Sequence, residues 1–108
     1  MASVYESNNL TTNDLRTIYA SYYGNVTALA ILKAQGLLNV EAADRDGRTP
    51  LSVAASEGNI DAVKYLVSNK ANLAIRDARK NNALADAKRE QRTAVVDYLK
   101  AITSNTII

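Results

Sequence analysis

Residues 44–59 read DRDGRTPLSVAASEGN, and this stretch contains the start and the end signals of a short helix. Thr49 can accept a hydrogen bond from the first helical turn, and Pro50 suits the first helical position, where its missing N–H costs nothing. Gly58 can end the helix, because glycine adopts a left-handed conformation without strain. Asn59 can then cap a second helix. The stretch therefore predicts two short helices joined by a tight turn.

Apolar residues of the two predicted helices fall at helical spacing. The first helix has Leu51, Ala54 and Ala55 on one face, and the second has a stripe made of Ile60, Val63, Leu66 and Val67. Neither helix is long enough to be stable by itself. The pair must therefore pack against neighbouring pairs.

The same pattern recurs along the chain with a period of 33–34 residues. A shift of 33 places Asp44 on Asp77, and a shift of 34 in the other direction places Gly58 on Gly24. A sequence period of this size is typical of solenoids. It divides the chain into a flexible leader (1–10), three repeats (about 11–43, 44–76 and 77–102) and a C-terminal tail (103–108).

The second repeat closely resembles the ankyrin repeat. The matching positions are Asp44-x-x-Gly47-x-Thr49-Pro50-Leu51-x-x-Ala54-Ala55-x-x-Gly58, then Val63-x-x-Leu66-Val67 and Ala71-Asn72. The resemblance is strong over 44–77, good over 77–102 and looser over 11–43. It implies an all-α solenoid of about three helix-turn-helix units with short finger turns, and a function in binding another protein.

Two narrower resemblances involve the first two repeats and the third repeat, respectively. The runs Ile18-Tyr19-Ala20-x-Tyr22-x-Gly24 and Val53-Ala54-Ala55-x-Glu57-Gly58 are similar to the C-terminal ankyrin module of animal-type glutaminases. The run Leu84-Ala85-Asp86-Ala87 resembles ankyrin segments of plant kinases of the integrin-linked-kinase type. The first resemblance implies an alternative function, a regulatory or assembly domain of a glutaminase-like enzyme whose amidase domain would lie outside this chain.

The chain departs from the family pattern at three kinds of position. The histidine that usually follows Pro-Leu and bridges neighbouring repeats is replaced by Ser52, which puts polar contacts between repeats in doubt. Lys80 and Gln91 occupy turn positions where the second repeat has glycine, so these turns lose the residue that tolerates positive φ. The first repeat lacks Thr-Pro-Leu, and Thr11 with Asp14 predicts a capping box at an earlier helix start.

The composition argues against catalysis. The 108-residue chain is 47% hydrophobic, which is enough for a core, but it has no Cys and no His. The commonest general base near neutral pH and the commonest metal ligand are therefore missing. We expect no catalytic residues, no cofactor, no metal and no small-molecule substrate. No apolar run approaches a membrane span and no leader peptide is evident, so an intracellular, cytoplasmic protein is expected.

Charge is unevenly placed around a net value of +2. Residues 1–43 carry a net charge of −1, whereas the segment 70–92 carries seven basic and three acidic residues, a net charge of +4. This asymmetry predicts an acidic partner protein, with a solvated outer face as the simpler interpretation. The basic third repeat alone is too little to predict nucleic-acid binding.

The ankyrin resemblance also places the partner-binding residues, at the finger turns and at the ends of the first helices. These residues are Tyr22, Tyr23, Arg45, Arg48, Glu57, Arg79 and Arg89. Arg and Tyr are enriched in binding hot spots. One of the two adjacent tyrosines could instead belong to the core. Tyr65 and Tyr98 occupy equivalent places on the second helices and are expected to be structural.

Two further features have more than one interpretation. Asp44 and Asp77 are expected to hydrogen-bond their own turns, and Asp86 with Glu90 is expected to be solvated. The last helix has an apolar outer side that must be covered by the folded-back tail, by a second copy in a homodimer, or by a partner. The ending Thr106-Ile107-Ile108 also resembles peptide endings that strand-adding domains bind.

Overall fold

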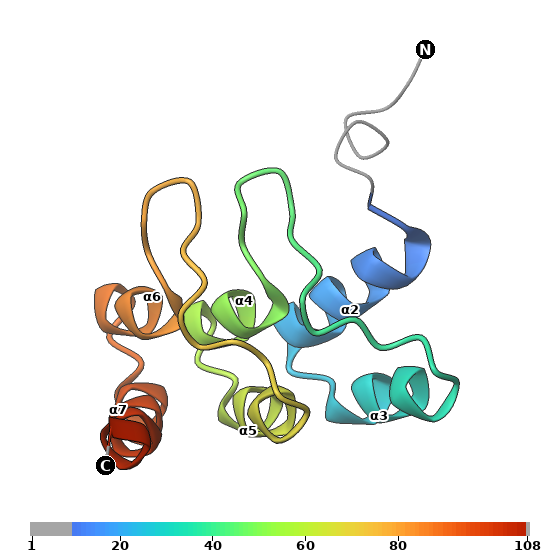
Figure 1. Cartoon of the computed structure of the whole chain (residues 1–108). Coiled ribbons are helices and arrows are strands. Elements are labelled where there is room, and N and C mark those ends of the chain that lie inside the picture. Colours follow the sequence, from blue (N-terminus) through green and yellow to red (C-terminus); the bar gives the residue numbers. More distant parts are fainter. Residues whose placement is uncertain (1–9, 108) are drawn as a thin grey trace.

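Six helices alternate with turns over residues 10–107, which this computed structural model describes. They are α2 (Thr12–Tyr23), α3 (Val26–Ala34), α4 (Pro50–Ser56), α5 (Ile60–Ser68), α6 (Ala83–Arg89) and α7 (Thr93–Ile107). Figure 1 shows two rows of helices, with α2, α4 and α6 in one row and α3, α5 and α7 in the other. Two finger turns project from the first row. The described part of the chain is thus the all-α, three-unit solenoid that the repeats predict.

The first-row helices begin at the capping residues that the sequence indicates. Thr11 and Asp14 form the predicted capping box, with each side chain accepting a hydrogen bond from the other's backbone N–H at 3.0 Å. The Thr49 hydroxyl accepts from the N–H of Ser52, and Pro50 is the first residue of α4. Such caps satisfy N–H groups that have no partner within the helix.

Left-handed residues shape the tight turns. Gly24, Gly58 and Gln91 follow the first-row helices with φ of +69°, +74° and +60°. Lys80 has φ +69° in the second finger turn, so the expected strain at both non-glycine positions is present. Lys70, at φ +70° after α5, is a third such residue and was not expected from the sequence.

The hydrophobic core runs through all three repeats without interruption. Its largest fully buried apolar side chains include Leu29, Leu51, Leu66, Leu99 and Val63. Helix α4 is buried along its whole length because α2 and α6 pack on either side of it. The alanines at 54, 55, 62 and 87 are completely buried, and their small side chains let the helices approach closely.

Polar contacts between repeats are made by residues other than the one in the family's histidine position. Ser52 accepts a hydrogen bond from Thr49 in its own repeat. The Asn59 side-chain amide instead donates to the carbonyls of Ser21 and Tyr22 at 3.0 and 2.7 Å, and Arg92 Nε donates to the carbonyl of Ser56 at 2.9 Å. Asn59 is the N-cap residue of α5, as predicted, but its side chain makes no hydrogen bond to that helix and reaches the preceding repeat instead.

The two ends of the chain differ from the sequence expectations. Residues 103–107 continue α7, so they do not form a tail that folds back. The opposite side of α7 packs inward on the core, where Val95 and Leu99 are buried. Tyr65 and Tyr98 pack against the core, as expected. Of the proposed leader, residues 1–9 lie outside the described residues, and Leu10 packs against a small cluster of Ile18, Ala42 and Val53.

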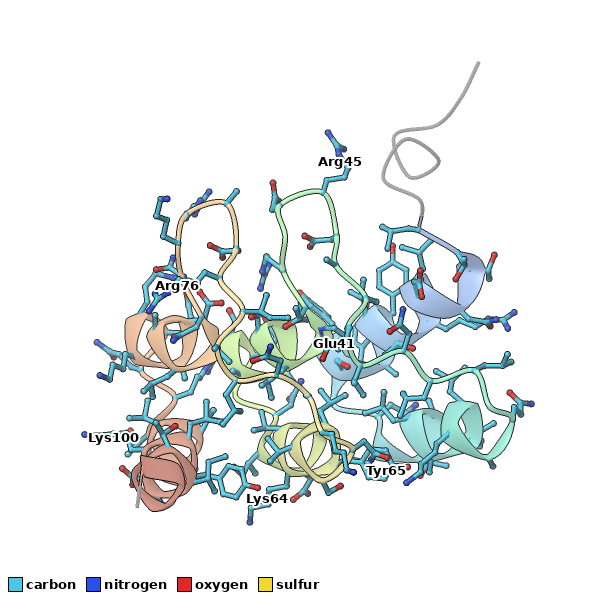
Figure 2. The ribbon with its side chains drawn as sticks, in the orientation of Figure 1. Glu41, Arg45, Lys64, Tyr65, Arg76 and Lys100 are labelled. Atoms are coloured by element: carbon cyan, nitrogen blue, oxygen red, sulfur yellow. The ribbon has the colours of Figure 1, made fainter. Side chains whose placement is uncertain are left out.

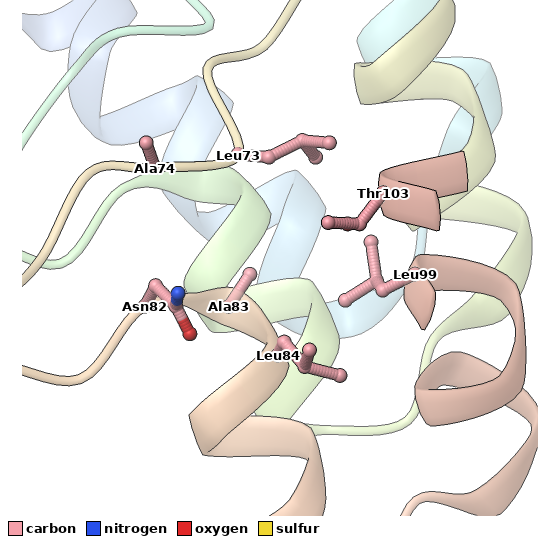
Figure 3. A pocket seen from close by; sticks show the side chains of 7 residues that line it. All are labelled: Leu73, Ala74, Asn82, Ala83, Leu84, Leu99 and Thr103. Atoms are coloured by element: carbon pink, nitrogen blue, oxygen red, sulfur yellow. The ribbon is translucent and has the colours of Figure 1, made fainter. Parts of the chain in front are cut away.

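An apolar hollow of about 380 Å³ lies between the start of α6, the segment before the second finger turn and α7 (Figure 3). Leu73, Leu84, Leu99 and Thr103 are among the residues that line it. This hollow lies where the end of the second repeat meets the third repeat. The prediction that a second copy covers the apolar outer side of the last helix stays a prediction.

Candidate functional site

Each finger turn is held by one aspartate at its base. Oδ1 of Asp44 accepts hydrogen bonds from the N–H groups of Asp46 and Arg48, both at 2.9 Å. Asp77 plays the same part in the second finger turn, where its Oδ1 accepts from two backbone N–H groups at 2.8 and 2.9 Å. The N–H of Ala78 also donates to the carbonyl of Asp46 at 2.8 Å, which joins the two turns. The two aspartates thus have the predicted turn role.

A charged hollow of about 280 Å³ lies in the angle between the two finger turns and the C-terminal ends of α4 and α6. Both turns and both helix ends contribute to its lining, which consists of Asp46, Arg48, Ser56, Glu57, Asp77, Ala78, Arg79, Asp86, Arg89 and Glu90. Four of the predicted partner-binding residues are therefore brought together here, namely Arg48, Glu57, Arg79 and Arg89.

A second hollow, the tyrosine hollow, adjoins the first and shares Arg48 with it. It has a volume of about 250 Å³ and lies between α2 and the first finger turn, lined by Ile18, Tyr19, Tyr22, Tyr23, Asp44, Arg48 and Val53. The rings of Tyr22 and Tyr23 meet edge to face with centroids 4.9 Å apart. Their exposed fractions are 44% and 75%, so the alternative that one of them is a core residue is wrong.

Arg45 is the one predicted contact residue that lines neither hollow. It lies at the tip of the first finger turn, and its side chain points away from the helices (Figure 2). Arg48 and Arg79 line the charged hollow, and neither forms an ion pair within residues 10–103. These two guanidinium groups are therefore available to a partner.

Asp86 is the functional candidate that the sequence reasoning missed. It was expected to be solvated, yet its exposed fraction is 1%. Oδ1 accepts a hydrogen bond from Arg89 Nη1 at 2.7 Å, whereas Oδ2 is buried and has no hydrogen-bond partner among the residues that the structure describes. A signal was present, because the 33-residue shift places Asp86 on Val53, which is also buried.

Arg89 is held by two carboxylates. Besides the contact with Asp86, its Nε donates to Glu90 Oε2 at 3.1 Å. The hydrogen bond to Asp86, followed by the one to Glu90, raises the pKa of Arg89 above its ordinary value. The guanidinium therefore stays charged and largely fixed in orientation, while its side chain remains 44% exposed.

The charged hollow is not a basic patch. Five carboxylates and three guanidinium groups line it, an excess of two negative charges. The positive charge of the segment 70–92 therefore does not carry over to this face. No group of three or more potential metal ligands of the Asp, Glu, His or Cys type occurs among the described residues. None of the helices described is both long and apolar enough to cross a membrane.

Comparisons with known proteins agree with this architecture. The chain is 39% identical to the mitochondrial liver isoform of glutaminase from Rattus norvegicus over 84 residues, which cover 77% of this chain and 14% of that protein. It is 33% identical to the serine/threonine-protein kinase VIK of Arabidopsis thaliana over 84 residues, or 78% of this chain and 19% of the kinase. The chain thus spans a small part of each relative.

A solved structure shows the same fold. It is a chain from the complex of a predatory endopeptidase of Bdellovibrio bacteriovorus with an immunity protein, and the TM-score is 0.75 at 31% identity. The match covers 80% of this chain and 45% of that chain. A family profile described as ankyrin repeats in three copies matches residues 17–106. The helix pairs, the finger turns and these matches together show that the chain belongs to the ankyrin-repeat family.

Proposed function

We propose that this ankyrin-repeat domain holds a partner protein in the angle between its finger turns and its first-row helices. The observation that carries the proposal is the pair of adjoining hollows that share Arg48. All the predicted contact residues except Arg45 line one or other of them. Exposed tyrosines beside unpaired arginines supply both apolar area and directional hydrogen bonds, the combination typical of binding hot spots.

The domain itself is proposed to be non-catalytic. Its ionisable side chains in the two hollows are arginines, carboxylates and tyrosines, and the chain contains no His or Cys. The proposal does not include the acidic partner that the overall charge pattern predicts, because carboxylates outnumber guanidinium groups in the charged hollow.

The test compares proteins captured from a cell lysate by three immobilised forms of the domain. The first is the parent chain, and the second carries Tyr22→Ala with Tyr23→Ala, which removes exposed area from the tyrosine hollow. The third carries Ile31→Ala with Leu37→Ala, a matched loss of exposed apolar area outside both hollows. We expect a set of proteins, identified by mass spectrometry, that the parent and the third form retain and the second form loses. Equal retention by all three folded forms would show that binding occurs elsewhere.

A second candidate function is suggested by the 39% identity to a glutaminase. We propose, as the alternative, that the chain serves as a regulatory or assembly domain of a glutaminase-like enzyme. The test is to determine the complete reading frame that encodes the chain and to assay the encoded protein for glutaminase activity. A reading frame without a hydrolase domain, or a product without activity, would rule this candidate out.

A further inference from the structure

We infer that the charged hollow binds a positively charged side chain, an arginine or a lysine, of the partner protein. The inference rests on the proposed protein-binding function and adds the chemistry of the partner. It starts from Asp86, whose carboxylate lies in the lining of the hollow between α4, α6 and the finger turns.

The Oδ2 atom of Asp86 is a buried acceptor that receives no hydrogen bond from the described part of the chain. Leaving a buried polar atom without a hydrogen bond costs about 1–3 kcal/mol, and more when the group is charged. Its sister atom Oδ1 is occupied by Arg89 Nη1 at 2.7 Å. Only a group with N–H or O–H to donate can remove the cost at Oδ2, and an incoming anion would increase it.

Some of the other carboxylates of the hollow already accept hydrogen bonds, and others are open, meaning that they form no ion pair. Oδ1 of Asp77 accepts two backbone N–H groups of its own turn, and Glu90 accepts from Arg89. Asp46 and Glu57 form no ion pair within the part of the chain whose side chains are described. Two open carboxylates, one from the first finger turn and one from the end of α4, therefore accompany the unpaired oxygen of Asp86.

Arg48 and Arg79 are open as well, and they could attract an anion instead. The balance of charge decides against this, because the lining has five carboxylates against three guanidinium groups. Arg89 is already neutralised by Asp86 and Glu90. An anion would thus meet two open cations and a net negative lining, whereas a cation gains from the lining and from the open oxygen of Asp86.

The size of the hollow favours one side chain over a whole small molecule. Its volume of about 280 Å³ lies below the range of roughly 300–1,000 Å³ that is common for small-molecule sites. Asp86 itself is only 1% exposed, so an incoming guanidinium or ammonium group reaches Oδ2 only when the Arg89 side chain, which is 44% exposed, moves aside. The chemistry therefore fits an arginine or lysine presented by a protein surface or peptide.

The test uses ¹⁵N-labelled domain and four blocked peptides, acetyl-Gly-Ser-X-Ser-Gly-amide, with X as Arg, Lys, Glu or Gln. We expect saturable shifts of the amide signals of Glu57, Ala78 and Arg89 with the Arg and Lys peptides and not with the Gln peptide. Asp86→Asn should weaken binding of the Arg peptide on the order of tenfold, since it removes one charged acceptor. Glu57→Gln should weaken it several-fold, and the exposed Glu41→Gln, outside the hollow, should leave it unchanged.

Three results would overturn the inference. The first is binding of the Glu peptide in place of the Arg peptide at the same amides, which reverses the partner's charge and leaves protein binding at this face intact. The second is no saturable shift with any peptide, which means that the hollow holds water only. The third is an affinity for the Arg peptide that is unchanged in both Asp86→Asn and Glu57→Gln. Glu57 is not buried, so its substitution keeps the test valid if Asp86→Asn fails to fold. Failure of protein binding at this face would appear separately, as equal retention in the lysate experiment.

Discussion

The side-chain amide nitrogen of Asn59 lies 2.7 Å from the carbonyl oxygen of Tyr22, 37 positions earlier in the chain. The same amide also donates to Ser21, so one side chain satisfies two carbonyls at the end of α2. Arg92 makes the equivalent contact from the third repeat to Ser56 of the second. One position per repeat, directly after the left-handed turn, thus connects each repeat to the one before it.

Asn59→Ala should destabilise the domain by about 1–2 kcal/mol, because the Tyr22 carbonyl loses the Asn59 donor and the Ser21 carbonyl is left with the Gly24 N–H. The control is Asn25→Ala, which removes the hydrogen bond that the Ala28 N–H donates to Asn25 Oδ1 within the same repeat and should cost about 1 kcal/mol or less. The free energy of unfolding from urea titration measures both. A smaller loss for Asn59→Ala than for Asn25→Ala would contradict the role of Asn59 between repeats.

Gly58→Ala should be more harmful than Gly36→Ala, although φ is nearly the same at the two positions, +74° and +73°. A Cβ at Gly36 would meet open space, so only left-handed strain of about 1 kcal/mol is expected there. A Cβ at Gly58 would lie 2.8 Å from Cδ of Arg92, which is held by its bond to Ser56. Steric conflict should add roughly 1–3 kcal/mol.

The double variant Gly58→Ala with Arg92→Ala separates the two causes. If the conflict with Arg92 is real, the double variant should be more stable than the sum of the single effects indicates, by an interaction free energy of about 1 kcal/mol or more. Thermal unfolding followed by circular dichroism is sufficient. Additive effects would mean that backbone strain alone explains Gly58.

Lys80→Gly and Gln91→Gly should each stabilise the domain by roughly 0.5–1 kcal/mol, because both residues are held at positive φ. Gln35→Gly is the matched control. Because Gln35 has an ordinary φ of −85°, glycine relieves no strain there and the domain should lose stability. In the parent chain, amide exchange is expected to be fastest over residues 78–102. A third repeat that is protected as well as the second would show that these two turns do not weaken it.

The Thr11–Asp14 capping box makes stability depend on pH. Burial raises the pKa of Asp14, but hydrogen bonds from the Thr11 N–H, the Asn39 amide and the Thr11 hydroxyl outweigh this and lower it overall. A lowered pKa in the folded state means that the carboxylate stabilises the fold above the unfolded pKa, near 3.8, and that this stability is lost as the pH falls through the folded pKa.

Asp14→Asn should therefore destabilise the domain at pH 7 and should differ little from the parent at about pH 2. The expected loss at pH 7 is roughly 0.5–1 kcal/mol, the range of a weakened helix cap. Asp97→Asn, a change at an exposed position of α7, serves as the control. Urea unfolding at several pH values provides the measurement. An equal gap between parent and Asp14→Asn at both pH values would rule out this linkage.

Features that depend on neighbouring residues in the chain could be predicted from the sequence. Thr49 and Pro50 favour the start of a helix through local effects, because the hydroxyl and the ring act on the adjacent backbone. Asp44 binds the N–H groups of its own turn for the same reason. The capping box at Thr11 is equally local. The fold follows from such signals repeated at a constant period.

Features that depend on the distance between repeats could not be predicted in the same way. Whether the amide of Asn59 caps its own helix or reaches Tyr22 is decided by how closely α2 approaches, which no local pattern reports. Asp86 was misjudged because its charged neighbours in sequence suggested a solvated surface. The equivalent position in the preceding repeat, Val53, predicts the burial of Asp86 correctly, because equivalent positions in successive repeats have similar surroundings.

The hydrogen bond from Ala78 N–H to the carbonyl of Asp46 joins the two finger turns through main-chain atoms alone. The interval between successive turns is consequently independent of which side chains the turns display. If the finger turns contact a partner as proposed, substitutions at Arg45, Arg48 or Arg79 should change what is bound while this interval stays the same. The backbone of the two turns would thus act as a fixed frame, on which a new binding specificity requires new side chains but no change in the spacing of the turns.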